Sequence, residues 1–178
     1  MVEATANDGM RRFQEALRRP LTAGEIILEF VALVGLGLNA GLAAYYGPRL
    51  AGRIPEHFDP SGRPDGFGGA GILWEGLLVS LLLYGLLTLV PRLPAHWLNL
   101  PGRITVENAA RVAGTVRLSL RVLKIFLVWM FTYVAWRSIA VARGVAAGLG
   151  PWFFVVAIVV GDLLLVVCIG LIGRAART

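Results

Sequence analysis

The sequence contains few residues of the kinds that build redox or catalytic centres. It has one cysteine, Cys168, and two histidines, His57 and His96. A single cysteine excludes an intramolecular disulfide and a cysteine-based metal cluster. The sequence offers no nucleophile–base pair, phosphate-cradling loop or metal-ligand spacing, so it argues against an enzyme and implies no cofactor.

Charged residues are also scarce, at 16% of the 178 residues, although the net charge is +6. The arginines are dispersed rather than gathered on one aromatic-rich surface, which argues against a nucleic-acid partner. Hydrophobic residues, by contrast, make up 57% of the chain. This is too apolar for a soluble domain and is typical of a membrane protein, with membrane lipids as its surroundings.

Four apolar runs are long enough to cross a membrane as helices, which takes about 20 residues each. We predict an all-α integral membrane protein with four transmembrane helices in an antiparallel up-down bundle. The first span is expected to be an uncleaved anchor, since signal-peptide cores are shorter. The expected spans are about 26–46, 71–90, 118–136 and 152–172.

The basic residues predict the orientation of these spans, because positively charged connections resist translocation. Five lie in the first and third connections: Arg49, Arg53, Arg63, Arg137 and Arg143. Ten lie in the terminal segments and the second connection: Arg11, Arg12, Arg18, Arg19, Arg92, Arg103, Arg111, Arg117, Arg174 and Arg177. Both termini are therefore expected to be cytoplasmic, with residues 47–69 outside.

Residues 1–22 form a polar segment that precedes the transmembrane domain of residues 23–178. Met10, Phe13 and Leu17 recur at helical spacing opposite arginines, which predicts a short amphipathic helix lying on the inner membrane surface. In the first span, Gly37 and Gly41 predict a small-residue seam for close helix packing. Asn39 beside them is expected to form a hydrogen bond across that interface.

Ionisable groups at membrane depth are costly, so each is expected to have a partner, an escape to the surface or a function. We expect Glu29 to meet Arg121 or Lys124 on one side of the membrane. Glu75 and Arg137 are expected to pair on the other side. Asp162 lies near the middle of the fourth span, where it is either a partner for Lys124, a hydrogen-bonding group, or a proton- or ion-coupling group.

The first connection contains the run HFDPSGRPDGFGG. Residues 59–62 and 63–66 both place proline second and glycine fourth, which predicts two type I turns and a structured outer loop. His57, Asp59 and Asp65 are weak candidates for metal ligands. The turn interpretation already accounts for both aspartates, so we predict no metal site.

This loop resembles the signature of a bacterial and archaeal membrane domain family of unknown function. That signature has a proline, a histidine followed by an aromatic residue, Asn or Asp, and then Gly-x-x-Asp-Gly-aromatic-Gly. The matching residues are Pro55, His57, Phe58, Asp59, Gly62, Asp65, Gly66, Phe67 and Gly68.

The domain forms the N-terminal part of immunity proteins against a sporulation-delaying peptide toxin, which also carry a further helical segment. The resemblance implies a multi-pass protein of the cytoplasmic membrane of a prokaryote. From these observations we expect a non-catalytic protein that binds a peptide or protein partner through the outer loop, as in immunity or signalling. The alternatives are an accessory subunit of a larger membrane complex and a small transporter that uses Asp162.

Overall fold

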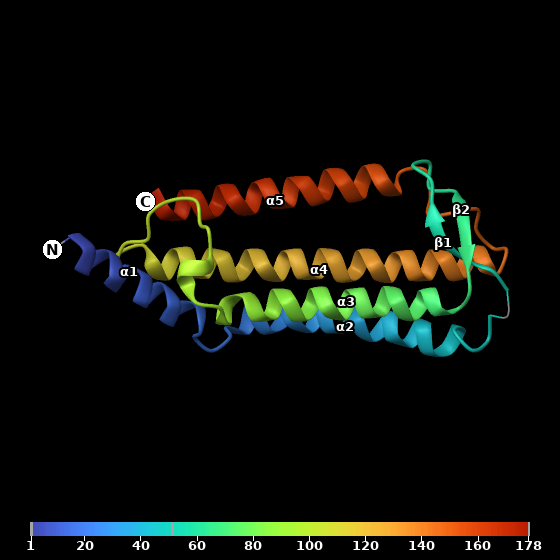
Figure 1. Cartoon of the computed structure of the whole chain (residues 1–178), viewed down its shortest axis with the longest axis horizontal. Helices are drawn as coiled ribbons and strands as arrows, with labels where there is room; N and C mark the ends of the chain where they lie inside the picture. The colour runs from blue at the N-terminus through green and yellow to red at the C-terminus, as the bar shows by residue number, and fades with distance from the viewer. Residues whose placement is uncertain (1, 51, 178) are drawn as a thin grey trace. The chain divides into compact units, whose positions relative to one another are not determined.

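The computed structural model describes residues 2–50 and 52–177. The chain order is α1 (Val2–Leu17), α2 (Ala23–Tyr46), β1 (Ile54–Phe58), β2 (Pro64–Gly68), α3 (Gly71–Leu89), η1 (Val90–Arg92), η2 (Ala95–Trp97), α4 (Ala109–Ala142) and α5 (Phe153–Arg177) (Figure 1). The elements η1 and η2 are short 3-10 helices.

Within the described residues, four helices are long and apolar enough to cross a membrane, as the sequence predicts. They are Ala23–Tyr46, Gly71–Arg92, Ala109–Ala142 and Phe153–Arg177. The third, α4, is a single helix of 34 residues that contains the predicted span of residues 118–136 and extends beyond it at both ends. Thr105 and Asn108 precede this helix and exchange side-chain to backbone hydrogen bonds, which satisfy amides at its start. A small two-stranded sheet of β1 and β2 is also present, in the loop for which the sequence predicts an ordered structure but no strands.

The chain divides into two compact units, and each of the four long helices contributes residues to both. The termini unit comprises Met1–Glu29, Gly85–Leu123 and Asp162–Thr178. The hairpin unit comprises Phe30–Tyr84 and Lys124–Gly161.

In the termini unit, the apolar face of α1 packs on protein. Phe13 is fully buried and Leu17 is 3% exposed, in a cluster that includes Val112 and Val116 of α4. Gly9 lies against the backbone around Ile104, where a Cβ atom would come within 2.8 Å of the carbonyl oxygen. The amphipathic helix is therefore confirmed, but Phe13 and Leu17 cover the protein core and are not free to enter a lipid surface.

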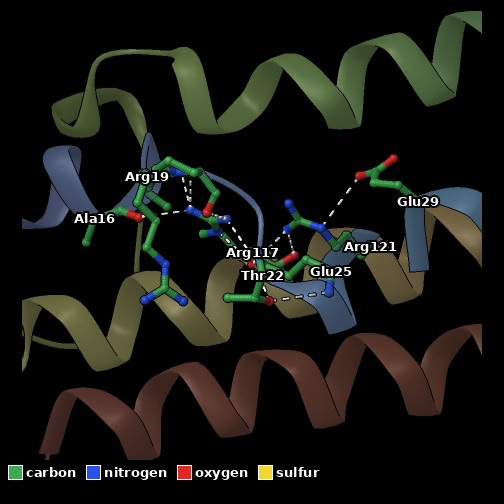
Figure 2. Close-up of polar contacts among 9 residues, drawn as sticks. Ala16, Arg19, Thr22, Glu25, Glu29, Arg117 and Arg121 are labelled. Atoms are coloured by element: carbon green, nitrogen blue, oxygen red, sulfur yellow. Dashed lines mark hydrogen bonds and ion pairs between the residues drawn. The ribbon is translucent and has the colours of Figure 1, made fainter. Parts of the chain in front are cut away.

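A buried arginine joins the end of α1 to the start of α2 (Figure 2). Arg117 of α4 is 1% exposed and donates two hydrogen bonds of 2.7 Å to the two carboxylate oxygens of Glu25. Its guanidinium also donates to the carbonyl oxygens of Ala16, Leu17, Arg19 and Pro20. Carbonyls at the end of a helix lack intrahelical partners, so Arg117 satisfies these groups and neutralises Glu25 with one side chain.

Arg121 extends this charged layer one turn further along α4. Its guanidinium lies 3.4 Å from a carboxylate oxygen of Glu25 and 3.6 Å from one of Glu29 (Figure 2). The predicted meeting of Glu29 with Arg121 is therefore confirmed. Lys124, in the hairpin unit, is 2% exposed and its ammonium lies 4.5 Å from the ring centre of Tyr84.

In the hairpin unit, α2 contacts α3 and α4 through small and polar side chains. Asn39 donates a 3.2 Å hydrogen bond to the Ser80 hydroxyl of α3, and both side chains are fully buried. Thr132 of α4 donates to the carbonyl oxygen of Gly35. A Cβ atom at Gly35 would come within 2.8 Å of Val128.

The glycine that permits close helix packing is therefore Gly35. The predicted seam of Gly37 and Gly41 is wrong, because both are exposed and neither has an atom within 4 Å of an added Cβ.

Replacing Arg117 with methionine tests the charged layer. The variant leaves four carbonyl oxygens and Glu25 without their donor, although Arg121 remains near Glu25. We expect the free energy of unfolding to fall by about 3 kcal/mol, at the lower end of the range for breaking a buried ion pair. Thermal unfolding in mild detergent measures this change. Glu29→Gln is the control, because Glu29 is more exposed and 3.6 Å from Arg121; equal losses for both variants would contradict the central role of Arg117.

Candidate functional site

The outer-loop motif folds into a β-hairpin. β1 pairs antiparallel with β2, with Ile54 opposite Gly68, Pro55 opposite Phe67, His57 opposite Gly66 and Phe58 opposite Pro64. The register shifts on both sides of His57, so the ladder is irregular at that residue. The expectation of a structured loop is met by strands as well as turns.

The tip of the hairpin is a tight turn organised by Asp59. One carboxylate oxygen of Asp59 accepts hydrogen bonds from the Ser61 amide, the Ser61 hydroxyl and the Arg63 amide, at 2.6–2.9 Å. These donors, the Ser61 hydroxyl above all, lower the pKa of the Asp59 carboxyl. Gly62 follows with a φ of +80°, a conformation that glycine adopts without steric cost.

The second predicted turn, residues 63–66, is not a turn. Pro64, Asp65 and Gly66 lie in β2 instead. Proline is compatible with an edge strand, where its missing amide need not join a ladder. The same residue order thus fits a turn or a strand, and pairing with β1 selects the strand.

His57 and Asp65 come together across the two strands. The His57 Nδ1 atom lies 2.5 Å from a carboxylate oxygen of Asp65, which is a short hydrogen bond. Their side chains are 72% and 47% exposed, so the pair faces outward. Asp59 is occupied by its turn, and within the described residues no three histidine, cysteine or acidic side chains are grouped to hold a metal ion.

The hairpin tip packs against the loop between α4 and α5. The Leu149 amide donates a 2.8 Å hydrogen bond to the carbonyl oxygen of Gly62. The backbones are very close at this point: a Cβ on Gly148 would lie 2.0 Å from that oxygen, and one on Gly62 would lie 2.5 Å from the Gly150 carbonyl oxygen. Only residues without a side chain fit here.

Two residues of α4 hold the α4–α5 loop beneath the hairpin. The Tyr133 hydroxyl donates a 2.7 Å hydrogen bond to the Leu149 carbonyl, and the guanidinium of Arg137 donates twice to the Gly148 carbonyl. Phe153 stacks on Tyr133 with ring centres 5.3 Å apart. The predicted pair of Glu75 with Arg137 does not form: Glu75 is exposed, and Arg137 binds the loop backbone.

One side of the hairpin therefore packs on the protein, and the other side, called the free side here, is exposed. Ile54 is fully buried in a cluster with Ala43, Leu73 and Ile139. On the free side Glu56, His57 and Asp65 are exposed, as is Phe67 at 38%. The guanidinium of Arg53 lies 5.4 Å from the ring centre of Phe67. This free side exposes an aromatic ring, a cation, carboxylates and an imidazole.

The residues that hold the hairpin tip in place were not predicted from the sequence. They are Tyr133, Gly148, Leu149 and Gly150. The glycines in the segment GLGP were a usable signal, because glycines on either side of one residue permit close backbone approach. Their contact with Gly62 is long-range, however, and no local pattern specifies it.

Comparison with models of protein families, with curated proteins and with solved structures finds no match to this chain. The resemblance to a membrane domain family thus depends on the short sequence signatures alone. What it implies for function remains a prediction.

A substitution at Gly148 tests the contact between the hairpin tip and the α4–α5 loop. Gly148→Ala places a Cβ atom where the Gly62 carbonyl oxygen now lies, so the hairpin or the loop must move. We expect a loss of about 1–3 kcal/mol in local stability, typical of overpacking. Faster amide hydrogen exchange across residues 54–68 measures it. Gly69→Ala is the matched control, since no atom lies within 4 Å of its Cβ position. Unchanged hydrogen exchange in Gly148→Ala would contradict the close contact between the hairpin tip and the α4–α5 loop.

Proposed function

We propose that this chain is a non-catalytic, multi-pass membrane protein that binds a peptide or protein partner through the free side of its hairpin. The observation that carries the proposal is the contrast between the two sides of this element. Its tip is fixed by Asp59, Gly62 and the α4–α5 loop, while His57, Asp65 and Phe67 point outward. A fixed backbone that presents exposed side chains is suited to binding.

A pre-formed hairpin favours binding because little conformational entropy is lost when a partner docks. Exposed aromatic residues and arginines supply much of the binding energy in protein interfaces. Phe67 and Arg53 meet this description, and the His57–Asp65 pair adds directional hydrogen bonds. The family resemblance supports immunity or signalling as the setting of such recognition.

The proposal includes a topology. We infer that α2–α5 cross the cytoplasmic membrane of a prokaryote as an antiparallel up-down bundle, with both termini in the cytoplasm. The ten-to-five distribution of basic residues supports this orientation. The hairpin and the α4–α5 loop are then on the outer side, where they meet molecules that arrive from outside the cell.

A role as accessory subunit of a larger membrane complex is the second candidate. The observation that favours it is the exposure of α5, whose most apolar stretch has none of its residues buried, whereas 28% of the corresponding stretch of α2 or α4 is buried. Such a helix has room for contacts with other membrane proteins.

Thiol labelling tests the topology. Ser61→Cys in a Cys168→Ser background places the sole thiol at the exposed hairpin tip. We expect it to react with a membrane-impermeant maleimide in intact cells. Trp97→Cys is the control, because residue 97 is exposed and lies in the second connection, so it should react only after the membrane is opened. The reverse result would invert the topology.

Photo-crosslinking tests partner binding. Benzoylphenylalanine replacing the exposed Phe67 should give a discrete adduct in living cells. The same amino acid replacing Trp152, which is 69% exposed in the same unit, should not. Asp65→Ala should weaken the adduct, because His57 loses its partner and the free side changes. Absence of any adduct at Phe67, or equal adducts at both positions, would contradict binding through the hairpin.

A further inference from the structure

Asp162 is an acidic residue in the interior of the apolar helix α5. It lies more than two turns from either end of α5, and its side chain is exposed. Among the described residues, no hydrogen bond or ion pair involves it. A carboxyl group at this depth is costly in hydrocarbon, and the short aspartate side chain cannot reach the membrane surface. The position therefore calls for a polar partner at the same depth.

The residues around Asp162 form a regular apolar seam on the exposed surface of α5. Val155, Ile158, Leu165 and Ile169 are spaced from Asp162 in alternating steps of three and four residues. Their exposed fractions are 50%, 60%, 46% and 57%. This is the spacing of the contact positions of a left-handed helix pair, with Val155, Asp162 and Ile169 in one set and Ile158 and Leu165 in the other.

The composition of this seam favours a parallel pair of helices. In parallel dimers, β-branched residues suit the first set of positions and leucine suits the second, and a single polar residue in the first set specifies the register. Val155 and Ile169 are β-branched, and Asp162 is the polar residue between them. In the second set Leu165 matches the preference, whereas the β-branched Ile158 departs from it. Residues of the first set contact their own counterparts across such an interface.

We propose that the seam of Val155, Ile158, Asp162, Leu165 and Ile169 binds the same seam of a second copy of this chain. Two copies inserted in the same orientation are parallel and place Asp162 at the same depth. The two carboxyl groups then meet at the symmetry axis, where one of them carries a proton and donates it in a hydrogen bond to the other. Each copy supplies the polar partner that the other lacks.

A second copy fits better than a helix that pairs through a cation of this chain. Three basic side chains in the interior of α4 are buried and already engaged in internal contacts: Arg117, Arg121 and Lys124 are 1%, 7% and 2% exposed. The chain thus offers another Asp162 a carboxyl group rather than a free cation. The proposal does not depend on partner binding by the hairpin, which is on different residues.

Disulfide crosslinking tests the proposal in native membranes. In a Cys168→Ser background, Ile169→Cys places a thiol in the seam, and a disulfide requires Cα atoms within about 7 Å of each other. Val167→Cys is the matched control, because Val167 is 45% exposed at almost the same depth but lies on the opposite side of α5. Mild oxidation should give a covalent dimer for Ile169→Cys and not for Val167→Cys.

Substitution of Asp162 tests its part in the interface, with dimerisation measured by fluorescence energy transfer as labelled protein is diluted in liposomes. We expect Asp162→Leu to weaken dimerisation about 5- to 30-fold, the factor that corresponds to an interhelical hydrogen bond. Asp162→Asn should retain most of it, because two amides also form hydrogen bonds with each other.

Three results would overturn the proposal. One is a protein that stays monomeric at every density. Another is equal crosslinking at Ile169→Cys and Val167→Cys. The third is dimerisation that is unchanged in Asp162→Leu. Binding of the monomer to a synthetic transmembrane helix with one central lysine, and not to its leucine counterpart, would instead assign the seam to a basic partner helix.

Discussion

Polar groups on apolar helices need partners within the protein, and the contacts that hold this chain together depend on that constraint. Hydrocarbon offers no water to replace a missing hydrogen bond, so an unsatisfied charge or backbone group is costly. Arg117 meets the constraint by binding Glu25 and the carbonyls that end α1. Asn39 meets it by donating to Ser80. Each such contact also determines which helix faces meet.

The backbone carbonyls of the α4–α5 loop, which supports the hairpin, also have partners within the protein. The α4–α5 segment has few side chains that could pack, and its carbonyls are held by Tyr133 and Arg137. That segment in turn donates to Gly62 at the hairpin tip. A rigid helix thus fixes an irregular loop, and the loop fixes the hairpin whose other side is free. Rigid support with an open face favours the recognition role that we propose, because little conformational entropy is then lost on binding.

Several features were predictable from the sequence because they depend on residues close together in the chain. Hydropathy located the long helices, and proline, serine and glycine after Asp59 located the hairpin turn. The meeting of Glu29 with Arg121 is an exception, because these residues are distant in the chain and matching charges at matching depths predicted their contact. The packing glycine was mispredicted, because small residues reveal that close contact is possible without revealing which face is used: Gly35, rather than Gly37 or Gly41, meets α4.

The sequence by itself determined where the helices run, because apolar length and helical periodicity act locally. It also determined the turn at Asp59, whose carboxylate binds amides only two and four residues away. Only the tertiary structure decided that Pro64 to Gly66 join a strand, that Phe13 is covered by protein, and that Arg137 binds a backbone carbonyl. These outcomes depend on partners distant in the sequence or on competition among several acceptors, which local preferences do not specify.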